Sequence, residues 1–128
     1  VYYKEAKGAV YFGLQNNDDN EWYFCFSDYN LDILKSDLLQ LFPKDYLCHT
    51  ALFILKEYDK NNNSELYSTL KAYFQCLLNV SHASNSLFIH RTSFIYRLNK
   101  IIELTKINLE DSNECMHLAF SFWILENE

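Results

Sequence analysis

The sequence predicts a mainly α-helical chain, in which a helical bundle follows a small α+β remnant with one short strand. Two observations predict the helices. Apolar residues recur at steps of three and four through most of the second half, and the 128 residues include only two glycines and one proline, too few for a turn-rich β fold. A third observation predicts the strand, because residues 22–26 are an unbroken run of aromatic residues and cysteine.

The first 42 residues are expected to be the tail of an upstream domain. Residues 2–14 have the spacing of a helix, and the polar stretch 15–21 is expected to be a loop. The strand at 22–26 needs partner strands, which an upstream segment or a second copy would supply. A further helix, capped by Asp28, is expected to follow it.

Residues 43–63 are interpreted as a linking helix, opened by Pro43, and a polar loop. From residue 64 onward the periodicity predicts four helices. Two pairs have the capping-box spacing that opens a helix: Asn62 with Glu65, and Asp111 with Glu114. The apolar stripe of the last helix is expected to contain Met116, Phe120 and Trp123.

Residues 79–105 predict a helix-turn-helix, in which a short supporting helix precedes a longer one that enters the major groove of DNA. The supporting helix is expected to run from Ser81, which would cap it, to Leu87. Phe88 and Ile89 form the connection, and because both are apolar we expect them to pack the turn against the core. The second helix repeats apolar residues at steps of four, three and four: Phe94, Leu98, Ile101 and Thr105.

The second helix, at about residues 91–104, carries the candidate DNA contacts. Arginine pairs bidentately with guanine edges, whereas lysine mostly meets phosphates. His90 lies just before the helix, where it can cap N–H groups or bond a phosphate. Tyr96 can reach a phosphate through its hydroxyl or pack its ring on a neighbouring helix. The candidate DNA-binding residues are Ser81, His90, Arg91, Thr92, Ser93, Tyr96, Arg97 and Lys100.

The charge distribution also favours docking on phosphates. Between residues 79 and 106 four cations stand against one acid, Glu103, a net charge of +3, whereas the whole chain has a net charge of −6. A positive face on an acidic body suits a protein that meets DNA in one orientation. Because one copy offers few positive charges, we expect a homodimer that reads half-sites one helical turn apart, or a multiple of it.

Three segments carry a resemblance to a known family: Asn79-Val80-Ser81, Leu87-Phe88-Ile89-His90-Arg91, and Tyr96-Arg97-Leu98 with Ile101. They resemble the C-terminal helix-turn-helix of PucR/CdaR-type bacterial transcription regulators, and the similarity extends from near Tyr58 to the end. Four positions depart from the family pattern: Leu78 for Gly, Ser84 for Ala, Thr92 for Asn and Ser93 for Thr.

The resemblance implies a sequence-specific binder of double-stranded DNA that acts as a cytoplasmic transcription regulator. It implies that residues 64–128 form the DNA-binding domain and that residues 1–42 end a GGDEF-like regulatory domain. Any effector ligand would then bind upstream. The chain begins at Val1, so we expect an excised fragment.

Other classes of function find little support. The acidic residues form no recognisable acid–base pair and no glycine-rich phosphate loop is present, so we expect no enzyme and no cofactor. No apolar run is long enough to span a bilayer. No metal site is expected, because the histidines share no ligand spacing and the cysteines, without a C-x-x-C pair, are expected to be reduced thiols. These residues are His49, His82, His117, Cys25, Cys48, Cys76 and Cys115.

Two alternatives to duplex binding stay open. The helices can form a protein-interaction or dimerisation module without DNA affinity, which the acidic body and an exposed Ile95 favour. The aromatic residues can instead stack on single-stranded nucleic acid, but most of them lie in apolar stripes rather than on a basic surface.

Overall fold

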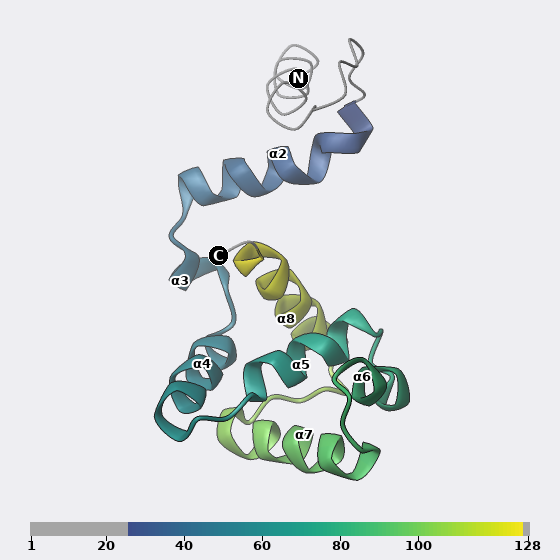
Figure 1. Cartoon of the computed structure of the whole chain (residues 1–128). Helices are drawn as coiled ribbons and strands as arrows, with labels where there is room; N and C mark the ends of the chain where they lie inside the picture. Colours follow the sequence, from purple (N-terminus) through teal and green to yellow (C-terminus); the bar gives the residue numbers. More distant parts are fainter. Residues whose placement is uncertain (1–25, 127–128) are drawn as a thin grey trace. The chain divides into compact units, whose positions relative to one another are not determined.

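The computed structural model describes residues 26–126 (Figure 1). This part of the chain contains seven helices and no strand, which confirms the prediction of a mainly α-helical fold. The chain divides into two compact units, residues 1–44 and 45–128. The helices are α2 (Phe26–Leu41), α3 (Lys44–Leu47), α4 (Thr50–Asn62), α5 (Leu66–Gln75), α6 (Val80–Ser86), α7 (Arg91–Thr105) and α8 (Ser112–Leu125).

In the first unit the structure describes helix α2. This helix already includes Phe26 and Ser27, so Asp28 lies inside its first turn and the predicted cap is wrong. The helix expected at 2–14 and the expected strand, apart from Phe26, lie outside the described residues.

The core of the second unit takes side chains from every helix from α4 to α8. Helix α5 contacts α4, α6 and α7, and it lies at the centre of the unit (Figure 1). The assignment of residues 43–63 to a link between domains stays a prediction, although α4 shares this core. The fully buried side chains of the core include Leu52 and Leu55 of α4, Leu70 of α5, Ala83 of α6, Phe94 and Ile101 of α7, and Leu118 and Ile124 of α8.

The start of α4 is fastened to α8. His49 is the N-cap residue, and its Nδ1 accepts a hydrogen bond from the Ala51 N–H at 3.0 Å. Its own N–H donates to the Ser121 hydroxyl at 2.7 Å, and its Nε2 lies 3.3 Å from a Glu114 carboxylate oxygen. Residues 43–63 contain two helices instead of the one expected, since α3 ends at Leu47 and α4 begins at Thr50.

Helix α8 buries a different side from the expected one. Asp111 caps it as predicted, accepting hydrogen bonds from the N–H groups of Asn113 and Glu114. The stripe that included Met116 is wrong, since Met116 is 68% exposed. The helix is apolar on nearly every side, so periodicity could not single out the inner face. That face consists of Leu118, Ser121, Phe122, Ile124 and Leu125.

The turn between α4 and α5 is held by Asp59. Its carboxylate accepts hydrogen bonds from the N–H groups of Leu66 and Tyr67, each at 2.8 Å, and from the Ser64 hydroxyl at 2.6 Å. The predicted capping box of Asn62 and Glu65 is therefore wrong, because Glu65 makes no side-chain cap. Asp59, in the last turn of α4, satisfies the donors at the start of α5 instead.

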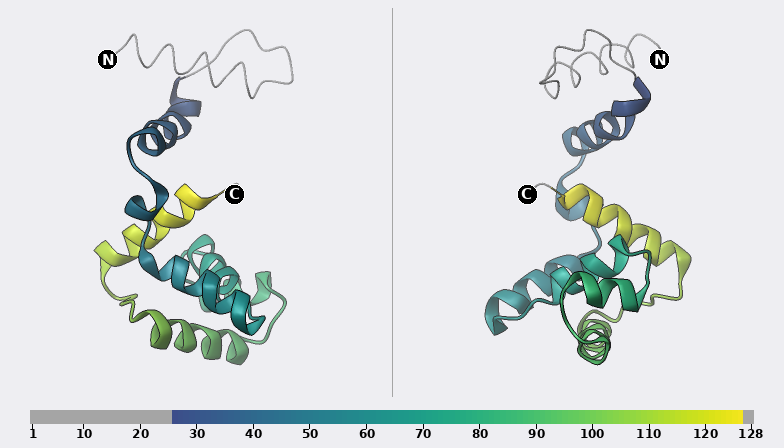
Figure 2. Two further views of the ribbon diagram at one scale, coloured as in Figure 1. Left: turned by 90° about the vertical axis from the view of Figure 1, so that its left-hand side faces the viewer. Right: turned by 45° about the vertical axis from the view of Figure 1, so that its right-hand side comes forward.

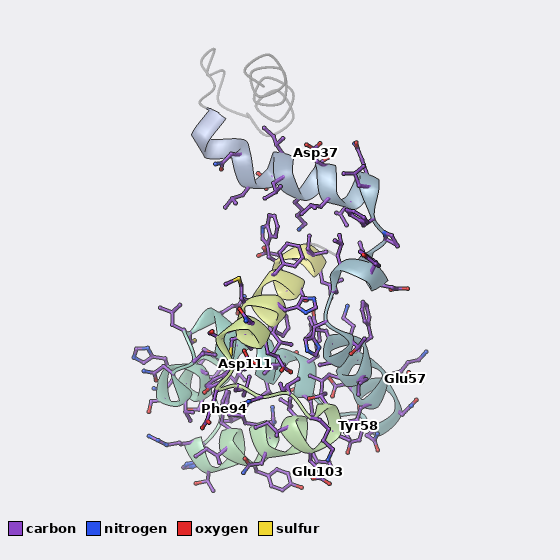
Figure 3. The ribbon with its side chains drawn as sticks, turned by 180° about the vertical axis from the view of Figure 1, so that it is seen from behind. Asp37, Glu57, Tyr58, Phe94, Glu103 and Asp111 are labelled. Carbon is purple, nitrogen blue, oxygen red and sulfur yellow. The ribbon has the colours of Figure 1, made fainter. Side chains whose placement is uncertain are left out.

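Replacing Asp59 with Ala is expected to destabilise the second unit by about 2–3 kcal/mol, because two backbone donors and a hydroxyl lose a charged acceptor. Urea unfolding followed by circular dichroism measures the change. Glu57→Ala is the matched control, since Glu57 is exposed on the same helix (Figure 3) and its loss should change stability by less than about 0.5 kcal/mol. Equal midpoints for the two variants would refute this role of Asp59.

Candidate nucleic-acid interface

Helices α6 and α7 form the helix-turn-helix, and α5 packs against both. The N-cap residue of α6 is Asn79, whose side-chain oxygen accepts a hydrogen bond from the His82 N–H at 2.9 Å. The prediction that Ser81 caps this helix is therefore wrong. Ser81 is the second residue of α6, and its hydroxyl accepts a hydrogen bond from Arg91 Nη1 at 3.2 Å. This bond joins the two helices across the turn.

The turn between α6 and α7 is a Schellman motif. The Ile89 N–H donates to the Ser84 carbonyl and the Phe88 N–H to the Asn85 carbonyl, each at 3.1 Å. Phe88 has a left-handed backbone, with φ of 56°, and its side chain is 95% exposed. The prediction that Phe88 packs against the core is wrong, because this conformation turns its side chain outward and leaves the core side to the half-buried Ile89.

The turn between α5 and α6 has the same construction. The Leu78 N–H donates to the Tyr73 carbonyl at 2.8 Å, and the Leu77 N–H donates to the Phe74 carbonyl at 3.1 Å. Leu77 and Leu78 have φ of 54° and 62°. A non-glycine residue in this region costs on the order of 1 kcal/mol. Both turns that flank α6 are therefore fixed by backbone hydrogen bonds that offset an unfavourable backbone conformation.

Helix α7 is held to the bundle by its apolar side. Phe94 and Ile101 are fully buried, and the Phe94 ring centroid lies 5.8 Å from that of Tyr73 in α5. Figure 2 shows α7 along one edge of the second unit, and Figure 3 shows Phe94 on its inner side, with Glu103 on its outer side. The stripe predicted for this helix thus faces the core, with Leu98 and Thr105 half-buried.

The first turns of α7 leave their other side open to solvent. His90, Arg91, Thr92 and Ser93 are all exposed, and Tyr96 is 72% exposed. His90 stands at the N-cap position as expected, but its side chain makes no capping hydrogen bond, so the capping role is wrong. The N–H groups of the first turn therefore keep their capacity to donate.

Arg97 and Lys100 point toward neighbouring groups. Arg97 Nη1 donates to the Thr69 hydroxyl at 3.3 Å and lies 3.7 Å from a Glu65 carboxylate oxygen. Lys100 Nζ lies 3.9 Å from a Glu103 carboxylate oxygen and 5.9 Å from the centre of the Tyr58 ring. The two cations line an open groove between α7 and the α4–α5 turn, together with Tyr58, Ser64, Glu65, Thr92, Ser93 and Tyr96.

Two residues that the sequence interpretation left out of the site lie within it. Glu65 pairs with Arg97 from 32 positions away, and no local pattern signals such a contact. Phe88 stands at the rim of a hollow shared with Arg91, and its position as an apolar residue in the turn signalled the wrong orientation.

The described residues offer no other chemistry of note. No three His, Cys, Asp or Glu side chains gather there as metal ligands, and no helix there is long and apolar enough to cross a membrane. No disulfide joins Cys48, Cys76 or Cys115. Burial, aided by the nearby Asp111 and Glu114 carboxylates, raises the pKa of Cys115 above its usual value, so this side chain stays a thiol at neutral pH.

Comparison with known proteins identifies a family model and several relatives that this chain resembles. Residues 66–124 match the family model of the PucR C-terminal helix-turn-helix domain. The carbohydrate diacid regulator of Escherichia coli is 36% identical over 107 residues, which cover 84% of this chain and 27% of that protein. The proline-responsive transcriptional activator PutR of Bacillus subtilis is 34% identical over 94 residues, 73% of this chain and 21% of that protein.

A third relative is the DNA-binding transcriptional activator AdeR of Bacillus subtilis, 28% identical over 116 residues that cover 88% of this chain and 26% of that protein. The chain thus spans about a quarter of the length of these relatives. No solved structure matches it. The matched residues contain all of α5, α6 and α7 and most of α8, the elements that build the interface described above. Residues 66–124 of this chain are therefore a PucR-type C-terminal helix-turn-helix domain.

Proposed function

We propose that this chain binds double-stranded DNA sequence-specifically as the reading end of a bacterial transcription regulator, with α7 in the major groove. The observation that carries the proposal is that α7 has one buried apolar side and one exposed polar side in its first turns. Phe94 and Ile101 fix the helix from below, while the first turns expose a cation, two hydroxyls and a phenol. A helix that enters a groove needs this combination of a buried underside and polar leading turns.

Each exposed side chain then has a role. Arg91 pairs with a base edge or an adjacent phosphate, and the Thr92 and Ser93 hydroxyls meet base edges. His90 and Tyr96 bond phosphates. Lys100 adds a positive charge farther along the same helix. Arg97 instead positions α7, since it already bonds Thr69 and pairs with Glu65.

The remaining features are proposed from the family and the charge. AdeR is named a DNA-binding transcriptional activator and PutR a proline-responsive one, which supports a regulator that acts on DNA. Such a regulator would act in the cytoplasm. We propose a homodimer, in which any effector ligand binds upstream of this fragment, and a division into a regulatory-domain tail (1–42), a link (43–63) and the DNA-binding domain (64–128).

A titration of binding against salt tests the proposal. The 128-residue chain is measured by gel shift on duplex DNA from upstream of its own gene. With about six phosphate contacts per dimer, affinity should fall on the order of a thousandfold between 50 and 200 mM salt. A dimer that retains the duplex equally at both salt concentrations, or does not retain it at all, would instead support the interaction module. That alternative draws on the exposed Ile95 and Tyr96, which are 38% and 72% exposed.

A further inference from the structure

Phe88 combines two features that are unfavourable for a large apolar residue. Its side chain is 95% exposed, the largest exposed fraction among the large hydrophobic residues there, and its φ of 56° lies in the region that favours glycine. A glycine or an asparagine would remove both. Leu77 shares both features, and what distinguishes Phe88 is the hollow that its side chain borders.

The backbone that carries the Phe88 ring is held by hydrogen bonds. Its own N–H donates to the Asn85 carbonyl, and the next N–H, of Ile89, donates to the Ser84 carbonyl. Ile89 is half-buried beneath the turn. A partner that touches the ring meets a side chain whose backbone is already ordered, so binding immobilises little more than the side-chain torsions.

The surroundings of the ring suit a polyanion. Phe88 borders an open hollow whose other side chains include Ser81, Ser84, Asn85, His90 and Arg91. None of the side chains that line this hollow is acidic. Arg91 reaches across it, with Nη1 3.2 Å from the Ser81 hydroxyl. An apolar ring next to a cation, hydroxyls and an amide matches the alternation of sugar, base edge and phosphate along one DNA strand.

We propose that Phe88 is a DNA-contacting residue whose ring packs on the C–H surface of the strand lining the major groove, beside the phosphate or base edge met by Arg91. This inference rests on the proposed function. Phe88 precedes Arg91 by three residues, so the ring reaches the wall of the groove when the first turn of α7 enters it. The surface it meets is a deoxyribose face or a thymine methyl group.

The test compares two glycine substitutions. Phe88→Gly removes the ring and relaxes the backbone. Leu77→Gly does the same at the matching position of the preceding turn, where φ is 54° and the side chain is 89% exposed, but outside the hollow. Each variant should raise Tm by about 3 °C. On a duplex that the wild-type chain selects from a randomised pool, Phe88→Gly should bind roughly tenfold more weakly and Leu77→Gly as tightly as the wild type.

A second probe identifies the surface that the ring meets. Replacing thymine by uracil throughout the selected duplex removes the C5 methyl groups. If the ring packs on a thymine methyl, the wild type loses affinity on this probe and Phe88→Gly loses none. If it packs on deoxyribose, the roughly tenfold difference between the wild type and Phe88→Gly stays the same on both probes.

The opposing outcomes are distinct. A wild type that selects and binds a duplex, with Phe88→Gly binding it equally, overturns the role of Phe88 and leaves the proposed function standing. Equal losses in both glycine variants overturn it as well, since a looser turn rather than the missing ring then explains the loss. If Phe88→Gly keeps the DNA affinity of the wild type but no longer regulates transcription, the ring contacts a protein partner, and its role in DNA binding is overturned. A wild type without duplex binding overturns both proposals.

Discussion

Replacing Phe94 with Ala is expected to destabilise the second unit by about 4 kcal/mol. The Phe94 side chain is fully buried and its ring meets that of Tyr73 in α5. Its removal leaves a cavity beneath the first half of α7, where Phe94 is the buried residue. Urea unfolding followed by tryptophan fluorescence measures the loss, which approaches the whole stability of a small domain.

Tyr96→Ala is the control for this prediction. Tyr96 lies two residues farther along the same helix, and it is 72% exposed. The substitution removes a side chain of similar size. Its stability should change by less than about 0.5 kcal/mol, whereas its DNA affinity should fall because its hydroxyl is lost as a phosphate contact. Comparable destabilisation by both substitutions would mean that α7 is not held through Phe94.

The inner side of α7 could be predicted because its sequence alternates consistently with the helical period. Phe94 and Ile101 recur seven residues apart, and the positions between them on the outer side are polar apart from Ile95. A local pattern is enough when the helix has one apolar side. The same reasoning failed for α8, where Met116 and Leu118 are both apolar. Contacts with other helices decide which side is buried, such as the hydrogen bond from His49 to Ser121 and the packing of Phe122 on the Phe74 ring of α5.

The contacts that the sequence did not predict join residues far apart or depend on backbone conformation. Asp59 caps a helix that begins seven residues later, whereas a capping box is read over three. Arg97 was a candidate DNA contact because it is a cation on the reading helix, yet Thr69 and Glu65 lie against it in α5 and at its N-cap. Phe88 appeared to belong to the core by its side chain, but its φ decides its direction.

Arg91→Ala and Arg97→Ala remove the same charge from the same helix, and they are expected to act differently. Arg91 is exposed at the first turn, so its loss should weaken binding to a selected duplex roughly 30-fold and reduce the slope of log affinity against log salt by about 1 per copy. Arg97 is half-buried against α5. Its loss should destabilise the unit by about 1 kcal/mol and weaken binding less than about threefold. Fluorescence anisotropy at several salt concentrations and urea unfolding give the two readouts.

The contrast between the two arginines separates a general electrostatic effect from a placed contact. If net charge alone drew the chain to DNA, both substitutions would lower affinity and salt slope equally, because each removes one positive charge from an acidic chain. A difference requires that the bundle present Arg91 to the duplex and keep Arg97 turned toward Thr69. Arg91→Lys adds a finer distinction, since lysine restores the charge and the salt slope but not a bidentate pair with guanine. Affinity that stays low in Arg91→Lys while the slope recovers would therefore assign Arg91 to a base edge rather than to a phosphate.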